Sequence, residues 1–145
     1  MNKKVITNHE VLNEAYSYER PSGFSRGIKI ELNGVDFLFI SGTASIDNDG
    51  KSIHIGDFKK QTLRTYYNIK KLLEAEGATW RDVVKTTVYI KDIKKYYDEF
   101  NKLRLSFFKE ENVFPYPASV GVQAVLCREE LLIEMDAIAI VKKKC

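Results

Sequence analysis

The chain has 145 residues, of which 44% are hydrophobic and 30% charged, and it carries a net charge of +3. These values are typical of one globular domain that is long enough to bury a core. Lysines and acidic residues are interspersed along the chain, so no basic stripe predicts a nucleic-acid partner. No apolar segment approaches the roughly 18 residues of a membrane helix, and no membrane partner is expected.

The chain start and the few metal-ligating side chains narrow the class further. Met1-Asn2-Lys3-Lys4 is not followed by a long apolar stretch, so we expect no secretory signal and a cytoplasmic protein. Cys127 and Cys145 predict neither a disulfide framework nor a metal site, and Cys127 is expected to be a small buried hydrophobe. With only two histidines, a histidine-based metal centre is not expected.

The first part of the chain is expected to contain an extension and then a hairpin. Residues 1–20 are polar and show no clear period, and we interpret them as an N-terminal extension to a single domain over residues 21–145. Residues 28–32 alternate strictly between apolar and polar side chains, which predicts a half-buried strand. Asn33-Gly34 is a strong hairpin signal, and residues 35–40 form the returning strand.

The end of the returning strand is the first candidate binding element. Its apolar run breaks into Ser41, Gly42 and Thr43, which place hydroxyl and backbone N–H groups at the strand end. A small anionic or carbonyl ligand fits such an element, and N–H groups suit a developing oxyanion. The alternative is a plain exit from strand to loop.

Two helices are predicted from their caps and apolar spacing. Asp57 is the expected N-cap of the first helix and Gly77 its end. Asp92 is expected to cap a second helix over about residues 93–110. The core stripe of that second helix is expected to be Tyr96, Phe100, Leu103 and Phe107, beside a row of Tyr97, Asn101, Arg104 and Phe108.

Three further strands are predicted from alternation. They cover residues 83–91, 119–126 and 131–141, and in the first of them Val84 and Thr86 share one side. The resulting order, ββαβαββ, is typical of an α+β sheet with two helices on one face.

The sheet face without helices is the predicted interaction surface. Its apolar side chains, among them Tyr89, Ile138 and Ile140, are too numerous to leave in water. Self-association of sheet against sheet in a closed homo-oligomer would cover them. Glu134 and Ser119 are expected on the same face, and polar groups caught between subunits need partners. We therefore expect a ligand cleft between subunits.

Motifs along most of the chain together resemble the Rid family, also known as the YjgF or L-PSP endoribonuclease and translation-inhibitor family. The resemblance covers about residues 20–141. It is carried by Phe39-Ile40-Ser41-Gly42, Asp49-Gly50-Lys51, Asp57 with Gln61, Asn68-Ile69, Val83-Val84-Lys85-Thr86-Thr87-Val88, Lys91-Asp92, Phe100-Asn101, Pro117-Ala118-Ser119, and Glu134 with Ala137-Ile138-Ala139. It implies a chorismate-mutase-like fold and a homotrimer with ligand clefts between subunits.

The activity implied by this resemblance is hydrolysis of reactive enamines and imines, such as 2-aminoacrylate, to a 2-keto acid and ammonia. Two expected parts are missing. The family arginine that binds the substrate carboxylate has Ala118 in its place, and a family tyrosine corresponds to Phe24, which has no hydroxyl. The parts that remain are Ser41, Gly42, Asn101 and Glu134.

A second resemblance is to the C-terminal part of chorismatases, which hydrolyse the enolpyruvyl ether of chorismate. It is carried by Ser41-Gly42-Thr43-Ala44-Ser45-Ile46, His54, Gly56-Asp57, Gln61, Thr62 and Asn68-Ile69. The resemblance implies that, in those enzymes, a glutamate near the position of Glu134 acts as the general acid. The chain resembles a standalone relative of that branch without the additional N-terminal domain, so chorismatase activity is not carried over whole.

Each candidate residue has an expected role and an alternative. Glu134 is the expected general acid, because burial and a nearby Asp136 would raise its pKa; the alternative is a structural acid. Arg104 or its rival Arg128 would bind a carboxylate in place of the missing arginine, and the alternative for both is a surface arginine. Asn101 would hold ligand or water, and the alternative is a hydrogen bond to nearby backbone. The other expected ligand-binding residues are Phe24, Ser41, Gly42, Thr43, Tyr89 and Ser119.

The expected function is hydrolysis or deamination of an imine, enamine or enolpyruvyl-like carboxylate between subunits, without a metal or organic cofactor. One alternative is a non-catalytic trimer that binds a small ligand or acts like a chaperone, which the two missing parts favour. A weaker alternative is an endoribonuclease or translation inhibitor, for which the chain offers no histidine pair or basic groove.

Overall fold

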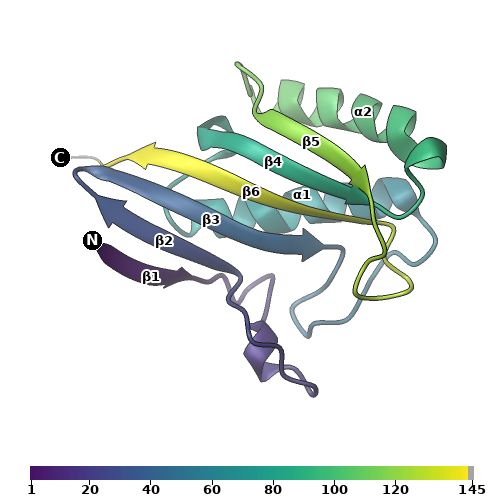
Figure 1. Cartoon of the computed structure of the whole chain (residues 1–145), viewed down its shortest axis with the longest axis horizontal. Helices are drawn as coiled ribbons and strands as arrows, with labels where there is room; N and C mark the ends of the chain where they lie inside the picture. The colour runs from purple at the N-terminus through teal and green to yellow at the C-terminus, as the bar shows by residue number, and fades with distance from the viewer. Residues whose placement is uncertain (144–145) are drawn as a thin grey trace.

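A computed structural model describes residues 1–143 of the chain, and its centre is a six-stranded sheet in the order β1-β2-β3-β6-β4-β5 (Figure 1). Both helices lie on the same side of this sheet. The elements are β1 (Asn2–Ile6), β2 (Gly27–Leu32), β3 (Val35–Ala44), α1 (Phe58–Glu74), β4 (Val83–Ile90), α2 (Ile93–Glu110), β5 (Ala118–Gln123) and β6 (Ile133–Lys142). The predicted α+β fold with two helices on one sheet face is confirmed, with β1 as an additional strand.

The predicted turn and helix caps explain where these elements begin. Both residues of the Asn33-Gly34 turn between β2 and β3 have positive φ values. The carboxylate of Asp57 accepts a hydrogen bond from the Lys60 N–H at 2.9 Å at the start of α1. Asp92 accepts one from the Lys95 N–H at 3.2 Å at the start of α2. Within residues 1–143, neither helix combines the length and apolar character needed to cross a bilayer.

The core fills the space between the sheet and the two helices. Leu38 of β3, Leu72 of α1 and Ile133 of β6 are fully buried there. Each such side chain stabilises the fold by roughly 1.5–3 kcal/mol relative to an exposed one. Phe108, expected beside the core stripe of α2, is itself 4% exposed and packs against Trp80. α2 is therefore packed into the core by side chains from both of its predicted rows, Phe100 and Phe108.

Residues 1–20 show no sequence pattern that predicts an element, but the structure has the edge strand β1 there. Four of the five residues of β1 are exposed, so the strand shows no alternation that would reveal it. Its last residue, Ile6, is fully buried, as is Leu12 in the segment that follows. The beginning of the chain therefore contributes to the same core as the helices.

Several side chains lie on a different face from the one predicted. A register shift between Val83 and Lys85 leaves Val83 buried and Val84 43% exposed, so the placement of Val84 beside Thr86 is wrong. Ser119 pairs with Thr86, which is 3% exposed on the helix side, so the placement of Ser119 on the open face is also wrong.

Of the two cysteines, only Cys127 lies in the part of the chain that the structure describes. Cys127 is exposed, so the prediction of a small buried hydrophobe is wrong, because this residue lies in the loop between β5 and β6 and not in a strand. Cys145 lies outside the described residues.

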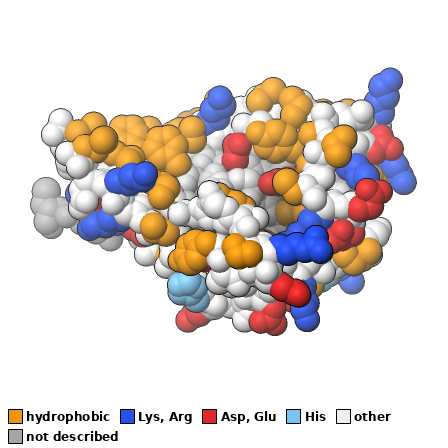
Figure 2. Space-filling view, turned by 60° about the horizontal axis from the view of Figure 1, so that its bottom comes forward, with side chains coloured by type: hydrophobic (Ala, Val, Ile, Leu, Met, Phe, Trp, Pro, Cys, Tyr) orange, Lys and Arg blue, Asp and Glu red, His pale blue; other side chains and the backbone are white. Residues whose placement is uncertain are grey.

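The sheet face without helices exposes apolar side chains. Phe39 of β3 is 43% exposed and lies opposite the half-buried Ile138 of β6, and Ile140 is 38% exposed. Figure 2 shows hydrophobic side chains in two areas along the upper edge of the view, with acidic side chains in the hollow between them. An apolar surface of this kind is typical of a protein–protein contact.

Candidate functional site

The candidate site begins at an irregularity in the β3–β6 ladder. Ile40 pairs with Ala137 and Thr43 pairs with Met135, whereas Ser41 and Gly42 have no partner in β6. Such a bulge bends the strand and releases backbone groups from the ladder. The predicted break after Ile40 is therefore a bulge inside β3.

Several hydrogen-bond donors at this bulge are already used within the protein and are not available to a ligand. The Ser41 N–H donates to the Arg26 carbonyl at 3.0 Å, and the Ser41 hydroxyl donates to the Ser25 carbonyl at 2.6 Å. The hydroxyl of Thr43, which is 1% exposed, donates to the Ser41 carbonyl at 2.7 Å. Ser41 and Thr43 thus stabilise the strand end, and the Gly42 backbone is the candidate ligand donor.

Glu134 of β6 lies directly against Gly42. A methyl group added to Gly42 would overlap the Oε1 atom of Glu134, so only glycine leaves room for this carboxyl group. Burial raises the pKa of Glu134, and the negative charge of Asp136 raises it further. The bulge therefore holds a carboxyl group whose pKa is raised, in direct contact with the Gly42 backbone.

Asp136 and Tyr89 form a hydrogen bond with each other, and neither residue lines one of the two cavities described below. Asp136 accepts a hydrogen bond from the Thr87 N–H at 3.1 Å and one from the Tyr89 hydroxyl at 3.2 Å. Burial is the main cause that raises the pKa of Tyr89, and the charge of Asp136 adds to it. The structure thus places Tyr89 beside the candidate site but outside the residues that line its cavity.

Glu134 and Gly42 line a cavity of about 780 Å³, which we call the Glu134 cleft. Phe24 forms part of its wall and is 41% exposed. The cleft is lined by the segment before β2, the bulge, the loop after β3 and the loop before β6. Its charged lining residues are Glu19, Arg20, Arg26, Asp49, Lys51, Arg128 and Glu134.

Arg128, predicted as a ligand-binding residue, lies in the Glu134 cleft. Its Nη1 atom donates to the Gly50 carbonyl at 2.7 Å and to the Ser52 hydroxyl at 3.1 Å. Its guanidinium carbon is 5.5 Å from the centre of the Tyr18 ring. The side chain is therefore fixed in place by neutral groups.

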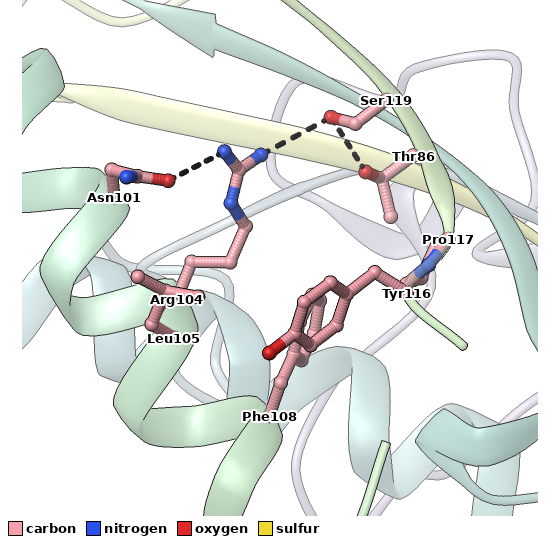
Figure 3. Close-up of a pocket in the computed structure, with 8 residues that line it drawn as sticks. All are labelled: Thr86, Asn101, Arg104, Leu105, Phe108, Tyr116, Pro117 and Ser119. Carbon is pink, nitrogen blue, oxygen red and sulfur yellow. Dashed lines mark hydrogen bonds between the residues drawn. The ribbon is translucent and has the colours of Figure 1, made fainter. Parts of the chain in front are cut away.

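A second cavity, of about 190 Å³, lies between α2 and β5, and we call it the Arg104 pocket (Figure 3). Arg104 donates to the Asn101 side-chain oxygen at 2.8 Å and to the Ser119 hydroxyl at 3.3 Å. Thr86 in turn donates to the Ser119 hydroxyl at 3.2 Å. These contacts hold the planar guanidinium group in one orientation, which suits recognition of a carboxylate.

The predicted site residues that line a cavity therefore fall into two separate groups, and Ser41, Thr43 and Tyr89 line neither cavity. Phe24, Gly42, Arg128 and Glu134 line the Glu134 cleft, whereas Asn101, Arg104 and Ser119 line the Arg104 pocket. The two cavities share no lining residue. The predicted catalytic pair, Glu134 and Asn101, is not brought together within one chain.

Sequence reasoning missed Arg26 and Tyr18 as lining residues of the Glu134 cleft. Arg26 follows Phe24 by two residues, directly before a predicted strand, and that position beside a candidate binding residue could have signalled it. Tyr18 lies in the segment without periodicity, and its ring packs so tightly against Gly50 that a Cβ atom there would overlap it. No local pattern predicts that long-range contact.

Comparison with known proteins supports the family expected from the motifs. The family model described as Endoribonuclease L-PSP matches residues 19–141. A RutC family protein of Pyrococcus abyssi is 39% identical over 121 residues, which is 83% of this chain and 88% of that protein. A RutC family protein of Aquifex aeolicus is 37% identical over 109 residues, covering 75% of this chain and 84% of that protein.

Solved structures show the same fold. The YjgF gene product from E. coli has a TM-score of 0.75 at 26% identity, covering 96% of this chain and 99% of that one. E. coli TdcF with bound serine has a TM-score of 0.77 at 23% identity, also covering 96% of this chain and 99% of that one. From the extent of these matches and the shared fold, the chain belongs to the Endoribonuclease L-PSP family, which includes the RutC and YjgF proteins.

Proposed function

We propose that the protein hydrolyses a small imine, enamine or enolpyruvyl-like carboxylate in a cleft between two copies of the chain. With an enamine such as 2-aminoacrylate, protonation of carbon gives the iminium ion. Water then adds to the C=N bond, and ammonia leaves as the keto acid forms. Glu134 in its protonated form supplies the first proton, and its carboxylate then takes a proton from the adding water and passes it to the leaving ammonia. The Gly42 backbone N–H donates to the oxygen that the water brings.

The observation that carries this proposal is the contact between Glu134 and Gly42. It places a carboxyl group with a raised pKa at a bulge, on the wall of an open cleft. General acids need a pKa close to the working pH, and burial is a common way to raise that of a glutamate. A glutamate that only stabilised the fold would need neither the cleft nor the bulge.

The proposal places each site between two subunits of a homotrimer. The fixed Arg104 and Asn101 lie outside the Glu134 cleft of their own chain, so a second copy is needed to combine them with Glu134. The exposed apolar side chains of the open sheet face supply a contact surface for that copy. Among proteins of the same fold, TdcF has serine bound, which is a small molecule with a carboxylate group, as the proposed ligands are.

The decisive test is Glu134→Gln with 2-aminoacrylate generated in the assay, measuring ammonia and keto-acid release. We expect turnover to fall by roughly a hundredfold or more, the usual contribution of a positioned general acid. Glu129→Gln is the matched control, because the Glu129 side chain is 97% exposed. Equal turnover in wild type and a folded Glu134→Gln protein would exclude the proposed role.

A second candidate function is binding of a small carboxylate without turnover. The observation that favours it is Phe24, which lines the cleft without the hydroxyl group that the family resemblance leads us to expect. Binding of a keto acid by wild type with no ammonia release from 2-aminoacrylate would support this function. Cleavage of RNA is not proposed, since no histidine lines either cavity.

A further inference from the structure

The deep part of the Glu134 cleft contains a buried positive charge without an acidic partner. Arg26 is 2% exposed, and its side chain donates to two neutral groups, the Asn13 carbonyl at 2.8 Å and the Tyr18 hydroxyl. Its backbone N–H donates to the buried Glu14 carboxylate at 3.3 Å, but the guanidinium group forms no ion pair in the described part of the chain. An unpaired buried charge is costly, so a partner is expected.

Arg128 adds a second guanidinium group to the same region. The guanidinium carbons of Arg26 and Arg128 lie 5.4 and 5.5 Å from the centre of one ring, that of Tyr18. Arg128 also binds only neutral groups, Gly50 and Ser52, and forms no ion pair among residues 1–143. Each guanidinium group keeps N–H donors beyond those used in these bonds.

The geometry points to a second anion-binding subsite in the Glu134 cleft, formed by Arg26 and Arg128 next to Tyr18, and we propose that it takes a second carboxylate of the ligand. This inference rests on the proposed function for the position of the reacting end of the ligand beside Glu134. It identifies the ligand class more closely as a dicarboxylate. The cleft volume of about 780 Å³ far exceeds the space that a three-carbon acid fills.

The charges around the cleft agree with this assignment. Arg20 and Lys51 also line it, so four cationic side chains face three acidic ones, Glu19, Asp49 and Glu134. Guanidinium groups bind carboxylates through paired N–H donors, and such charge-assisted bonds are the strong ones in proteins. Tyr18 holds the arrangement together, because it contacts both guanidinium groups and packs against Gly50.

The test compares two ligands that differ only at the far end of the chain. 2-Oxoglutarate and 2-oxopentanoate have the same length and the same keto-acid group, but only the first has a second carboxylate. We expect the wild-type protein to bind 2-oxoglutarate roughly tenfold to a hundredfold more tightly, as measured by titration calorimetry. Equal affinities would overturn the proposal.

Variants assign the preference to the arginines. Arg128→Gln is expected to bring the two affinities within a factor of about two, and Arg26→Lys to reduce the preference in part, since it keeps the charge and loses the planar donors. Arg81→Gln, at an exposed position outside both cavities, is the matched control. Loss of both affinities by the same factor in a folded Arg128→Gln protein would contradict the subsite. Displacement of 2-oxoglutarate by lower concentrations of inorganic phosphate would overturn the carboxylate assignment.

The two proposals fail in different ways. If Glu134→Gln abolishes turnover of 2-aminoacrylate but wild type shows no dicarboxylate preference, the subsite is wrong and the proposed function stands. If an Arg128-dependent preference is measured in a protein without turnover, the subsite stands and hydrolysis is wrong. Arg26→Lys, at a buried position, is interpreted only when its circular dichroism and size match wild type, and Arg128→Gln decides the outcome otherwise.

Discussion

The Glu134 cleft and the Arg104 pocket of one chain differ in what each provides. The cleft is large and contains a carboxyl group with a raised pKa beside a strand bulge, together with cationic side chains. The pocket is small, and its arginine is already held by Asn101 and Ser119. The cleft thus has a carboxyl group and room for a ligand, whereas the pocket has a guanidinium group held in one orientation. Under the proposed function, a complete site needs both cavities, taken from neighbouring chains.

Mixing two inactive variants tests this division most directly. Glu134→Gln and Arg104→Gln each damage one cavity, and in mixed trimers some sites combine the intact Glu134 of one chain with the intact Arg104 of the next. Random mixing in equal amounts would restore about a quarter of the wild-type activity if each site joins two chains of a closed ring. Exchange of subunits is checked by native mass spectrometry, and turnover is measured on 2-aminoacrylate. Activity that stays at the average of the two variants after exchange would place each site within one chain.

Gly42→Ala tests whether the contact at the bulge positions Glu134. The added methyl group displaces the carboxyl group, and a displacement of about 1 Å can cost roughly a hundredfold in rate. The melting temperature should change little, because the group that yields is the end of a side chain and not the backbone. Gly121→Ala is the matched control, since a Cβ atom there would be 3.7 Å from the Tyr97 ring. Wild-type turnover in Gly42→Ala would show that this contact does not position Glu134.

Arg104→Lys tests whether the smaller pocket orients the substrate. Lysine keeps the charge but loses the fork that bonds Asn101 and Ser119, so we expect KM to rise roughly tenfold with a smaller change in kcat. Steady-state kinetics separate the two parameters, and Arg81→Lys serves as the control. A fall in kcat at constant KM would assign Arg104 to the chemical step and not to binding.

The smallest expected effect is the contribution of Glu134 to the pH dependence of the free energy of unfolding. Its pKa is raised in the folded protein, so its contribution to stability is present below the ordinary value of 4.5 and is lost as the pH rises through the raised value. Glu134→Gln lacks this loss, and its stability relative to wild type should therefore increase with pH above 4.5. Chemical denaturation at several pH values measures the difference. A constant difference across this range would contradict a raised pKa.

Much of the fold could be predicted because local signals and final structure agree. The alternation at residues 28–32, the Asn33-Gly34 turn and the caps Asp57 and Asp92 all define elements that the structure contains. β1 could not be predicted, because an edge strand that is exposed on both faces carries no apolar period. The faces of Val84 and Ser119 were missed for a different reason. They depend on register and bulges, which are long-range properties of the sheet.

The site was predictable only in part. The family resemblance predicts that Glu134 and Gly42 belong to the same site, and the structure brings them into contact. Their separation from Asn101 and Arg104 could not be predicted, because it follows from which helix and strand edge each residue occupies. Arg26 was missed because its burial depends on how the N-terminal segment folds over the cleft.

The bulge in β3 has a consequence for how proteins of this kind diverge. The bulge shifts the β3–β6 register by one residue, so that Ile40 opposite Ala137 and Thr43 opposite Met135 are both buried on its two sides. A substitution in the cleft beside Gly42 therefore changes what the cleft accepts without moving any core side chain to the other sheet face. Selection on ligand preference and selection on foldability thus act on different residues of one strand, so new specificities can evolve while the scaffold stays the same.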